Sequence, residues 1–138
     1  MPLKLSLKPD EVVIVNGAVI RNGDRRGVML LENKARILRE KDIMMPEQAT
    51  TPARRAYFAV MQLYLTGELS GAAYDRAARA LSELISIVQD PEDVESVVSV
   101  SADLVAGQVY KGLGRCKSLM KRIDGAGVQL VEDTAEAG

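Results

Sequence analysis

The hydrophobic pattern of this chain changes its period near residue 45, and this change limits the fold to one in which strands precede helices. Before that point, apolar residues alternate with polar ones, as in LKLSLK (3–8), or form short runs such as VVIV (12–15). Beyond it, apolar residues recur every three or four positions, the spacing of an amphipathic helix. The sequence therefore predicts an α+β chain with a β-rich basic region at 1–45, an α-helical region at 46–123 and a flexible acidic tail at 124–138.

Turn signals divide the first region into about five short strands. Pro9-Asp10 favours a turn and suggests a first hairpin, and Asn16-Gly17 suits a two-residue hairpin because both residue types tolerate positive φ. We expect a small antiparallel sheet or barrel. Its predicted strands are 3–7, 12–15, 18–21, 28–31 and 35–39.

Several of these strands are apolar on successive residues, so we expect both faces of the sheet to be covered. A region of about 45 residues is near the lower limit for independent folding. Its stability should then come from the helices that follow, from a second copy of the chain, or from both. The sequence accordingly predicts a homo-oligomer, most simply a dimer.

The second region is predicted to form about four α-helices. Thr51-Pro52 is typical of a helix start, because threonine caps the first turn and proline tolerates its first position. Val94, Val97, Val98, Leu104 and Val105 are expected in the core of the third helix. The predicted helices run over about 51–65, 70–89, 91–106 and 108–123.

Composition excludes several classes of function. The chain has no histidine, which removes the commonest general acid–base, so we expect neither an enzyme nor a cofactor. Its single cysteine, Cys116, is expected to be a buried apolar side chain, and a metal site is not expected. No apolar run is long enough to cross a bilayer, so we expect a cytoplasmic protein that makes no membrane contact.

Charge divides along the same boundary as the hydrophobic period. The first 55 residues carry 11 Lys and Arg against 7 Asp and Glu, whereas the remaining 83 carry 7 against 12. This asymmetry indicates different partners for the two halves, an anion for the first and a protein surface for the second.

Three strings of the sequence are distinctive: NGAVIRNGDRRG (16–27), LLENKARILREKDIM (30–44) and TTPARRAYFAVMQLYL (50–65). In this order they resemble the flagellar biosynthesis repressor family FlbT of alphaproteobacteria. The resemblance implies a post-transcriptional regulator that binds the 5′ untranslated region of flagellin mRNA and works with the regulator FlaF. Some members act as activators, so the resemblance leaves the sign of regulation open. In strand number and size, the first region also resembles the dimeric RNA-binding protein CsrA, by analogy only.

Basic residues of the first 55 positions are the candidate RNA-binding site, because arginine can contact phosphates and stack on unpaired bases. The alternatives are a solvated turn at residues 25–26, a packed salt bridge for residue 21, weak ion pairs or edge-strand charges at 34–41, and a carboxylate partner for the two arginines at 54–55. At a helix start those two arginines oppose the macrodipole, which favours an external anion or a carboxylate beside them. The candidate residues are Arg21, Arg25, Arg26, Lys34, Arg36, Arg39, Lys41, Arg54 and Arg55.

A second interpretation is a protein-binding adaptor. In it the acidic helical half binds FlaF or a flagellin, and effects on mRNA are indirect. The net charge of −1 favours this interpretation, since many RNA-binding domains are far more basic.

Overall fold

The computed structural model describes the backbone of residues 2–137 and side chains up to residue 125. It confirms an α+β chain in which five strands precede four α-helices. The chain forms two compact units, one of residues 1–43 with 65–67 and the other of residues 44–64 with 68–138. The tail predicted at 124–138 lies, from residue 126 on, outside the residues whose side chains are described. Within the described residues, no helix is both long and apolar enough to cross a membrane.

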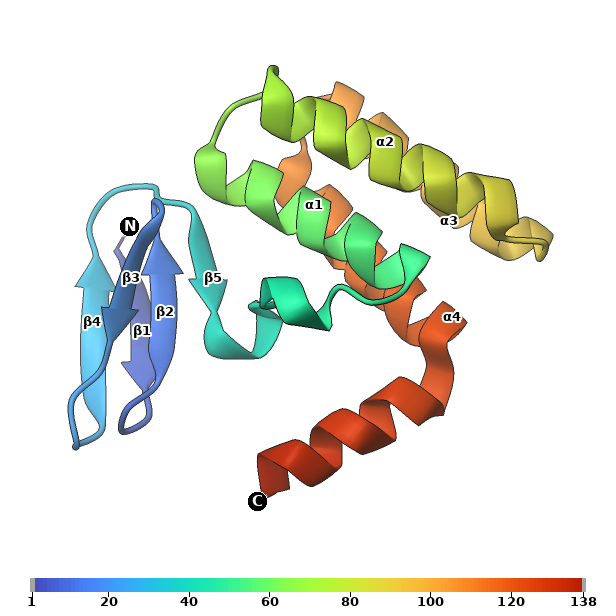
Figure 1. The fold of residues 1–138 in the computed structure, drawn as a ribbon. Helices are drawn as coiled ribbons and strands as arrows, with labels where there is room; N and C mark the ends of the chain where they lie inside the picture. Colours follow the sequence, from blue (N-terminus) through green and yellow to red (C-terminus); the bar gives the residue numbers. More distant parts are fainter. Residues whose placement is uncertain (1, 138) are drawn as a thin grey trace. The chain divides into compact units, whose positions relative to one another are not determined.

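The first unit holds two small antiparallel sheets (Figure 1). One sheet pairs β1 with β4, and the other has the order β3-β2-β5. No closed barrel forms among the described residues, so that form of the prediction was wrong. The strands are β1 (Leu3–Leu7), β2 (Val12–Val15), β3 (Ala18–Arg21), β4 (Gly27–Leu31) and β5 (Ile37–Arg39).

The hairpin expected between β1 and β2 is also absent, because the chain passes from one sheet to the other at residues 8–11. Asp10 takes a positive φ of 61° and donates its amide proton to the carbonyl of Gly23 at 2.8 Å. The β3–β4 loop thus holds this turn away from a hairpin geometry. The predicted hairpin at Asn16-Gly17 is confirmed, with φ of 50° and 86° and antiparallel pairing of β2 with β3.

The core of the first unit is small. Three side chains form its buried cluster, those of Leu5, Leu7 and Val13, and partly buried residues of β2 to β5 pack around them. Val13 and Ile14 are successive residues of β2 and both are buried. Because neighbouring side chains of a strand point to opposite faces, β2 buries both of its faces, as predicted.

The second unit contains the four α-helices and a one-turn helix, η2 (Pro46–Gln48). Thr51 caps α1 as predicted, since its Oγ1 accepts the amide proton of Arg54 at 3.1 Å. Asp90 caps α3 in the same way through Glu92. The helices are α1 (Pro52–Thr66), α2 (Ala72–Ile87), α3 (Pro91–Val105) and α4 (Val109–Ala137), the last broken at Gly125 by non-helical torsions.

The buried face of α3 differs from the predicted one. Val98 and Val105 are 52% and 78% exposed, although both were expected in the core. Val97, Val100 and Leu104 form the buried face instead. Their spacing of three and four residues leaves Val98 and Val105, each one position further along, turned toward solvent.

Helices α3 and α4 approach closely at Gly112. A Cβ added there would lie 3.3 Å from Asp103 Cβ and 3.3 Å from Leu104 Cδ2, whereas one added at Gly114 meets nothing within 4 Å. Alanine raises helix propensity at either site by about 1 kcal/mol. We therefore expect Gly114→Ala to stabilise the protein and Gly112→Ala to give no gain or a loss, as measured by urea denaturation. Equal stabilisation by the two substitutions would show that α3 and α4 have room to separate.

Candidate nucleic-acid interface

One end of the first unit is formed by the β1–β2 turn, residues 8–11, together with the β3–β4 loop, residues 22–26. We call this region the loop end. Asn22 holds its two segments together, because its side-chain amide donates to the carbonyls of Lys8 and Arg25, each at 2.8 Å. Its backbone amide donates to the carbonyl of Glu11, also at 2.8 Å. The loop end is therefore a built structure in which two segments distant in the sequence are fixed beside each other.

Arg25 and Arg26 are exposed on the loop end, and neither forms an ion pair within the described part of the chain. Lys8 lies on the adjoining turn and is also exposed. The sequence did not identify Lys8 as a candidate, because the approach of its turn to the β3–β4 loop depends on the contacts of Asn22, which are distant in sequence. The structure thus brings a third cation to the two predicted arginines.

Arg21 and Arg39 also reach the loop end, but their side chains are held by the protein. Arg21 Nη1 donates to the carbonyl of Asp10 at 3.2 Å. Arg39 Nη2 lies 2.8 Å from Glu11 Oε2 and donates to the carbonyl of Ser6 at 2.7 Å. The hydrogen bond from the Lys8 amide, followed by that from Arg39, lowers the pKa of Glu11 below its usual value. Arg39 is therefore paired with a carboxylate, whereas Arg21 has no carboxylate partner among the residues whose side chains are described.

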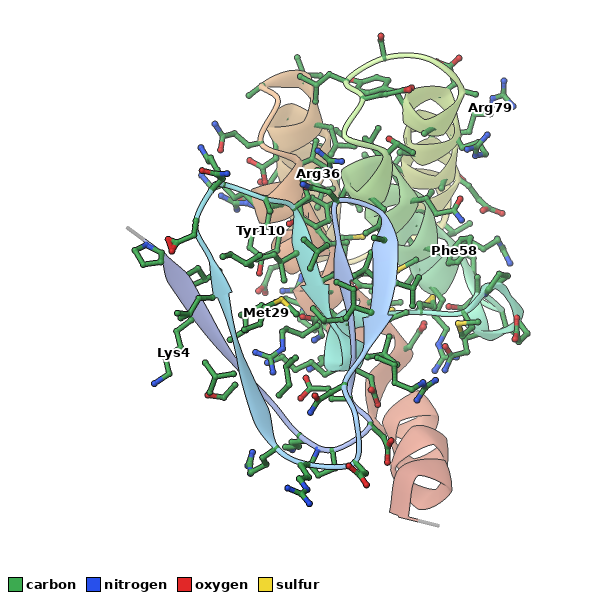
Figure 2. All side chains as sticks on the ribbon, turned by 90° about the vertical axis from the view of Figure 1, so that its left-hand side faces the viewer. Lys4, Met29, Arg36, Phe58, Arg79 and Tyr110 are labelled. Atoms are coloured by element: carbon green, nitrogen blue, oxygen red, sulfur yellow. The ribbon has the colours of Figure 1, made fainter. Side chains whose placement is uncertain are left out.

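The remaining candidate cations of the first unit lie in two other places. Lys41 is in a one-turn helix, η1 (Glu40–Asp42). This helix contacts the start of β2, because the Val12 amide donates a hydrogen bond to Glu40 Oε1 at 2.6 Å. Arg36 is at the opposite end of β2, where its amide donates to Asn16 Oδ1 at 2.8 Å (Figure 2). Lys34 precedes Arg36 on the same connection. Lys34 and Arg36 therefore do not join the loop end.

Arg54 and Arg55 belong to the second unit, and both contact carboxylates there. Arg54 is 8% exposed, donates to the carbonyl of Gln48 at 3.0 Å and lies 3.8 Å from Asp124 Oδ2. Arg55 lies 3.1 Å from Glu83 Oε2 on the surface. Of the two explanations for cations at this helix start, the structure supports the carboxylate partner.

A groove between α3 and α4 offers a second arrangement of cations, but these are also paired. Its volume is about 330 Å³, and Arg115 and Arg122 line it together with serine hydroxyls. Arg115 Nε lies 2.8 Å from Asp103 Oδ2 in an ion pair that lacks hydrogen-bond geometry. Arg122 binds Asp93 and lies 3.4 Å from Glu92. A polyanion would therefore meet more cations that are exposed and free of a carboxylate partner at the loop end than in this groove.

Aromatic platforms are absent from the first unit, since every Tyr and Phe of the chain follows residue 56. Tyr57 is buried, and Tyr64 packs against Tyr110 with ring centroids 5.2 Å apart. An RNA base at the loop end would have to stack on a guanidinium plane. Phosphate contact and arginine stacking are the interactions that this surface can supply.

Comparison with known proteins places these features in a family. The family described as "Flagellar protein FlbT" matches residues 3–124. A protein of Caulobacter vibrioides named "Flagellum biosynthesis repressor protein FlbT" is 47% identical over 90% of this chain and 88% of its own length. One from Rhodopseudomonas palustris, named a probable flagellum biosynthesis repressor, is 38% identical over 88% of this chain and 94% of its own. No solved structure matches the chain. The chain belongs to the FlbT family of flagellar proteins.

Proposed function

We propose that this protein is a cytoplasmic repressor of flagellin synthesis that binds the 5′ untranslated region of flagellin mRNA, without catalysis, through its loop end. The names of its relatives support the repressor role. The observation that carries the RNA-binding part is the exposure of Arg25 and Arg26, free of carboxylate partners within the described residues, on a loop that Asn22 fixes beside Lys8. The loop-end cations of the proposal are Lys8, Arg21, Arg25 and Arg26.

Phosphate contacts of this kind make binding depend on salt. Each contact with a single-stranded nucleic acid releases counterions and adds about −0.7 to the slope of log affinity against log salt. Four loop-end cations would then give a slope of roughly −3. RNA held by these side chains would block the ribosome from the leader or hold the transcript in a form open to decay.

The test is a titration of flagellin leader RNA at two salt concentrations. We expect Arg25→Ala with Arg26→Ala to weaken binding roughly tenfold or more, and to reduce the slope by about 1.4, because two phosphate contacts are lost. The matched control is Arg76→Ala with Arg79→Ala, which removes two exposed arginines of α2; Figure 2 shows Arg79 at the surface. Equal losses for the two variants, or binding that does not respond to salt, would contradict an RNA site at the loop end.

A second candidate function is the protein-binding adaptor, favoured by apolar side chains exposed on the second unit. Leu69, Val105 and Tyr110 are 58%, 78% and 63% exposed. Leu69 lies beside the turn between α3 and α4 that separates Val105 from Tyr110, because a Cβ added at Gly107 in that turn would be 3.5 Å from Leu69 Cδ1. A FlaF-type regulator or a flagellin would cover this surface. Retention of such a protein after ribonuclease treatment, without retained RNA, would favour the adaptor over the RNA-binding repressor.

A further inference from the structure

The β1–β4 sheet has two strands among the described residues, so neither of its outer edges has a neighbouring strand. Within the described residues β4 pairs with β1 alone, so the backbone groups along its other edge have no strand partner (Figure 1). At the free edge of β1 a further strand is discouraged, because prolines flank β1 at positions 2 and 9 and Lys4 lies within it. β4 reads GVMLL, without charge or proline. Its free edge is therefore the one able to accept another strand.

The outward face of β4 is apolar and bounded by opposite charges. Val28 and Leu30 are each 58% exposed, whereas Met29 and Leu31 pack on the core of the unit, with Met29 labelled in Figure 2. Extending the alternation of the strand by one step at each end places Arg26 and Glu32 on the same face as Val28 and Leu30. The face thus reads basic, apolar, apolar and acidic along the chain.

We propose that two copies of this protein associate by antiparallel pairing of their β4 strands about a twofold axis at Met29. This register places Val28 of each copy opposite Leu30 of the second copy. Arg26, which directly precedes β4, then lies opposite Glu32 of the second copy, which directly follows it. The apolar side chains of the two copies contact each other across the new strand pair, and the Arg26–Glu32 pair occurs twice in the dimer.

The charges at the two ends of β4 indicate that the strand paired with its free edge comes from a second copy of the chain. They also fix the register of this strand pairing. Pairing centred on residue 28 would put Arg26 opposite Leu30, and pairing centred on residue 30 would put Glu32 opposite Val28. Both of these alternatives place a charge opposite an apolar side chain, whereas the register centred on Met29 pairs apolar with apolar side chains and Arg26 with Glu32. Neither Arg26 nor Glu32 has an ion pair within the described part of the chain, so both side chains are available to a partner.

Cysteine crosslinking tests the register directly. Residues directly opposite in an antiparallel pair have Cα atoms about 4.5 to 5.5 Å apart, which a disulfide can bridge. The native Cys116 does not compete, because it is buried and burial raises its pKa to about 12. We expect a mixture of the Val28→Cys and Leu30→Cys variants to form a disulfide-linked dimer under mild oxidation, while neither variant alone does so. Crosslinking by the single variants to the same extent, or none in the mixture, would overturn this register.

Molecular mass in solution, measured without RNA by light scattering, tests the association itself. We expect twice the monomer mass of 15.0 kDa for the native chain. Arg26→Glu or Glu32→Arg alone should raise the dissociation constant roughly tenfold, because each places two pairs of like charges across the strands. The two substitutions together should restore it, since each pair is then reversed and not broken, and circular dichroism confirms that each variant is folded. A monomeric native chain at its highest soluble concentration, or a double variant as weak as the single ones, would overturn the proposal.

Discussion

Replacing Arg54 with methionine is expected to lower the free energy of unfolding by about 2 to 3 kcal/mol, whereas the same change at the adjacent Arg55 should cost less than about 1 kcal/mol. The Arg54 and Asp124 side chains are both about 10% exposed. Removing the guanidinium leaves the Asp124 carboxylate in a water-poor site with Thr51 Oγ1, at 2.7 Å, as its remaining described partner. Arg55 and Glu83 are 43% and 47% exposed, so water screens their attraction. Urea denaturation of the two variants measures the difference.

A double-mutant cycle with Asp124→Asn shows whether the loss comes from the ion pair. If Arg54→Met and Asp124→Asn destabilise the protein additively, the ion pair contributes no coupling energy. The loss of stability in Arg54→Met would then come from lost packing and from the lost hydrogen bond to the Gln48 carbonyl. The same variant separates structure from RNA binding. Folded Arg54→Met protein should retain the affinity of the native chain for leader RNA, since Arg54 is not a loop-end cation.

Features encoded by neighbouring residues were predictable from the sequence. Asn16-Gly17 forms its hairpin, Thr51 caps α1, and the change of period near residue 45 marks the passage from strands to helices. Each of these depends on torsion preferences or hydrogen bonds within a few residues. The number of helices and strands follows from such local signals.

Features that depend on distant residues were not predictable. The turn at Asp10 was assigned to a hairpin, because the amide's partner, Gly23, lies in another loop. Arg39 donates a hydrogen bond to Glu11, which is 28 positions away in the sequence, and Thr51 donates one to Asp124, which is 73 positions away. A count of basic residues cannot show which of them meet carboxylates in the fold, and so the nine candidate cations were not distinguished. Lys8 was missed because its turn is brought beside the β3–β4 loop by Asn22, 14 positions away.

The two proposals assign different roles to two adjacent arginines. In the β4 pairing, Arg26 faces Glu32 of the second copy, whereas Arg25 lies opposite Asn33, which carries no charge. Arg25 therefore remains available to phosphate in the dimer, together with Lys8 and Arg21. Arg26 contacts phosphate only in the free chain, so we expect a salt slope of roughly −3 for the free chain and roughly −2 for the dimer, and the Arg25→Ala with Arg26→Ala variant reduces the slope of the dimer by about 0.7. The dimer would also add stability to the first unit by mass action, since association favours the folded strand.

The small core of the first unit makes it the more fragile part of the chain. Leu7→Ala is expected to cost about 3 kcal/mol, which is large for a region of this size, because it removes one of only three side chains in the buried cluster. Leu3→Ala, the same change on the same strand, should cost less than about 1 kcal/mol, since Leu3 is 50% exposed. Hydrogen exchange measures the effect residue by residue: we expect the amides of β2 to lose protection in Leu7→Ala while those of α3 keep it.

RNA binding by the Leu7→Ala variant connects this stability to the proposed site. The loop end exists only while the first unit is folded, because Asn22 reaches the carbonyl of Lys8 across the two loops. Leader RNA should therefore bind Leu7→Ala far more weakly than Leu3→Ala, although neither change alters the charge. If the amides of α3 lose protection from hydrogen exchange together with those of β2, the two units unfold together. If a variant whose β2 amides exchange freely keeps full affinity for RNA, the RNA site lies outside the first unit.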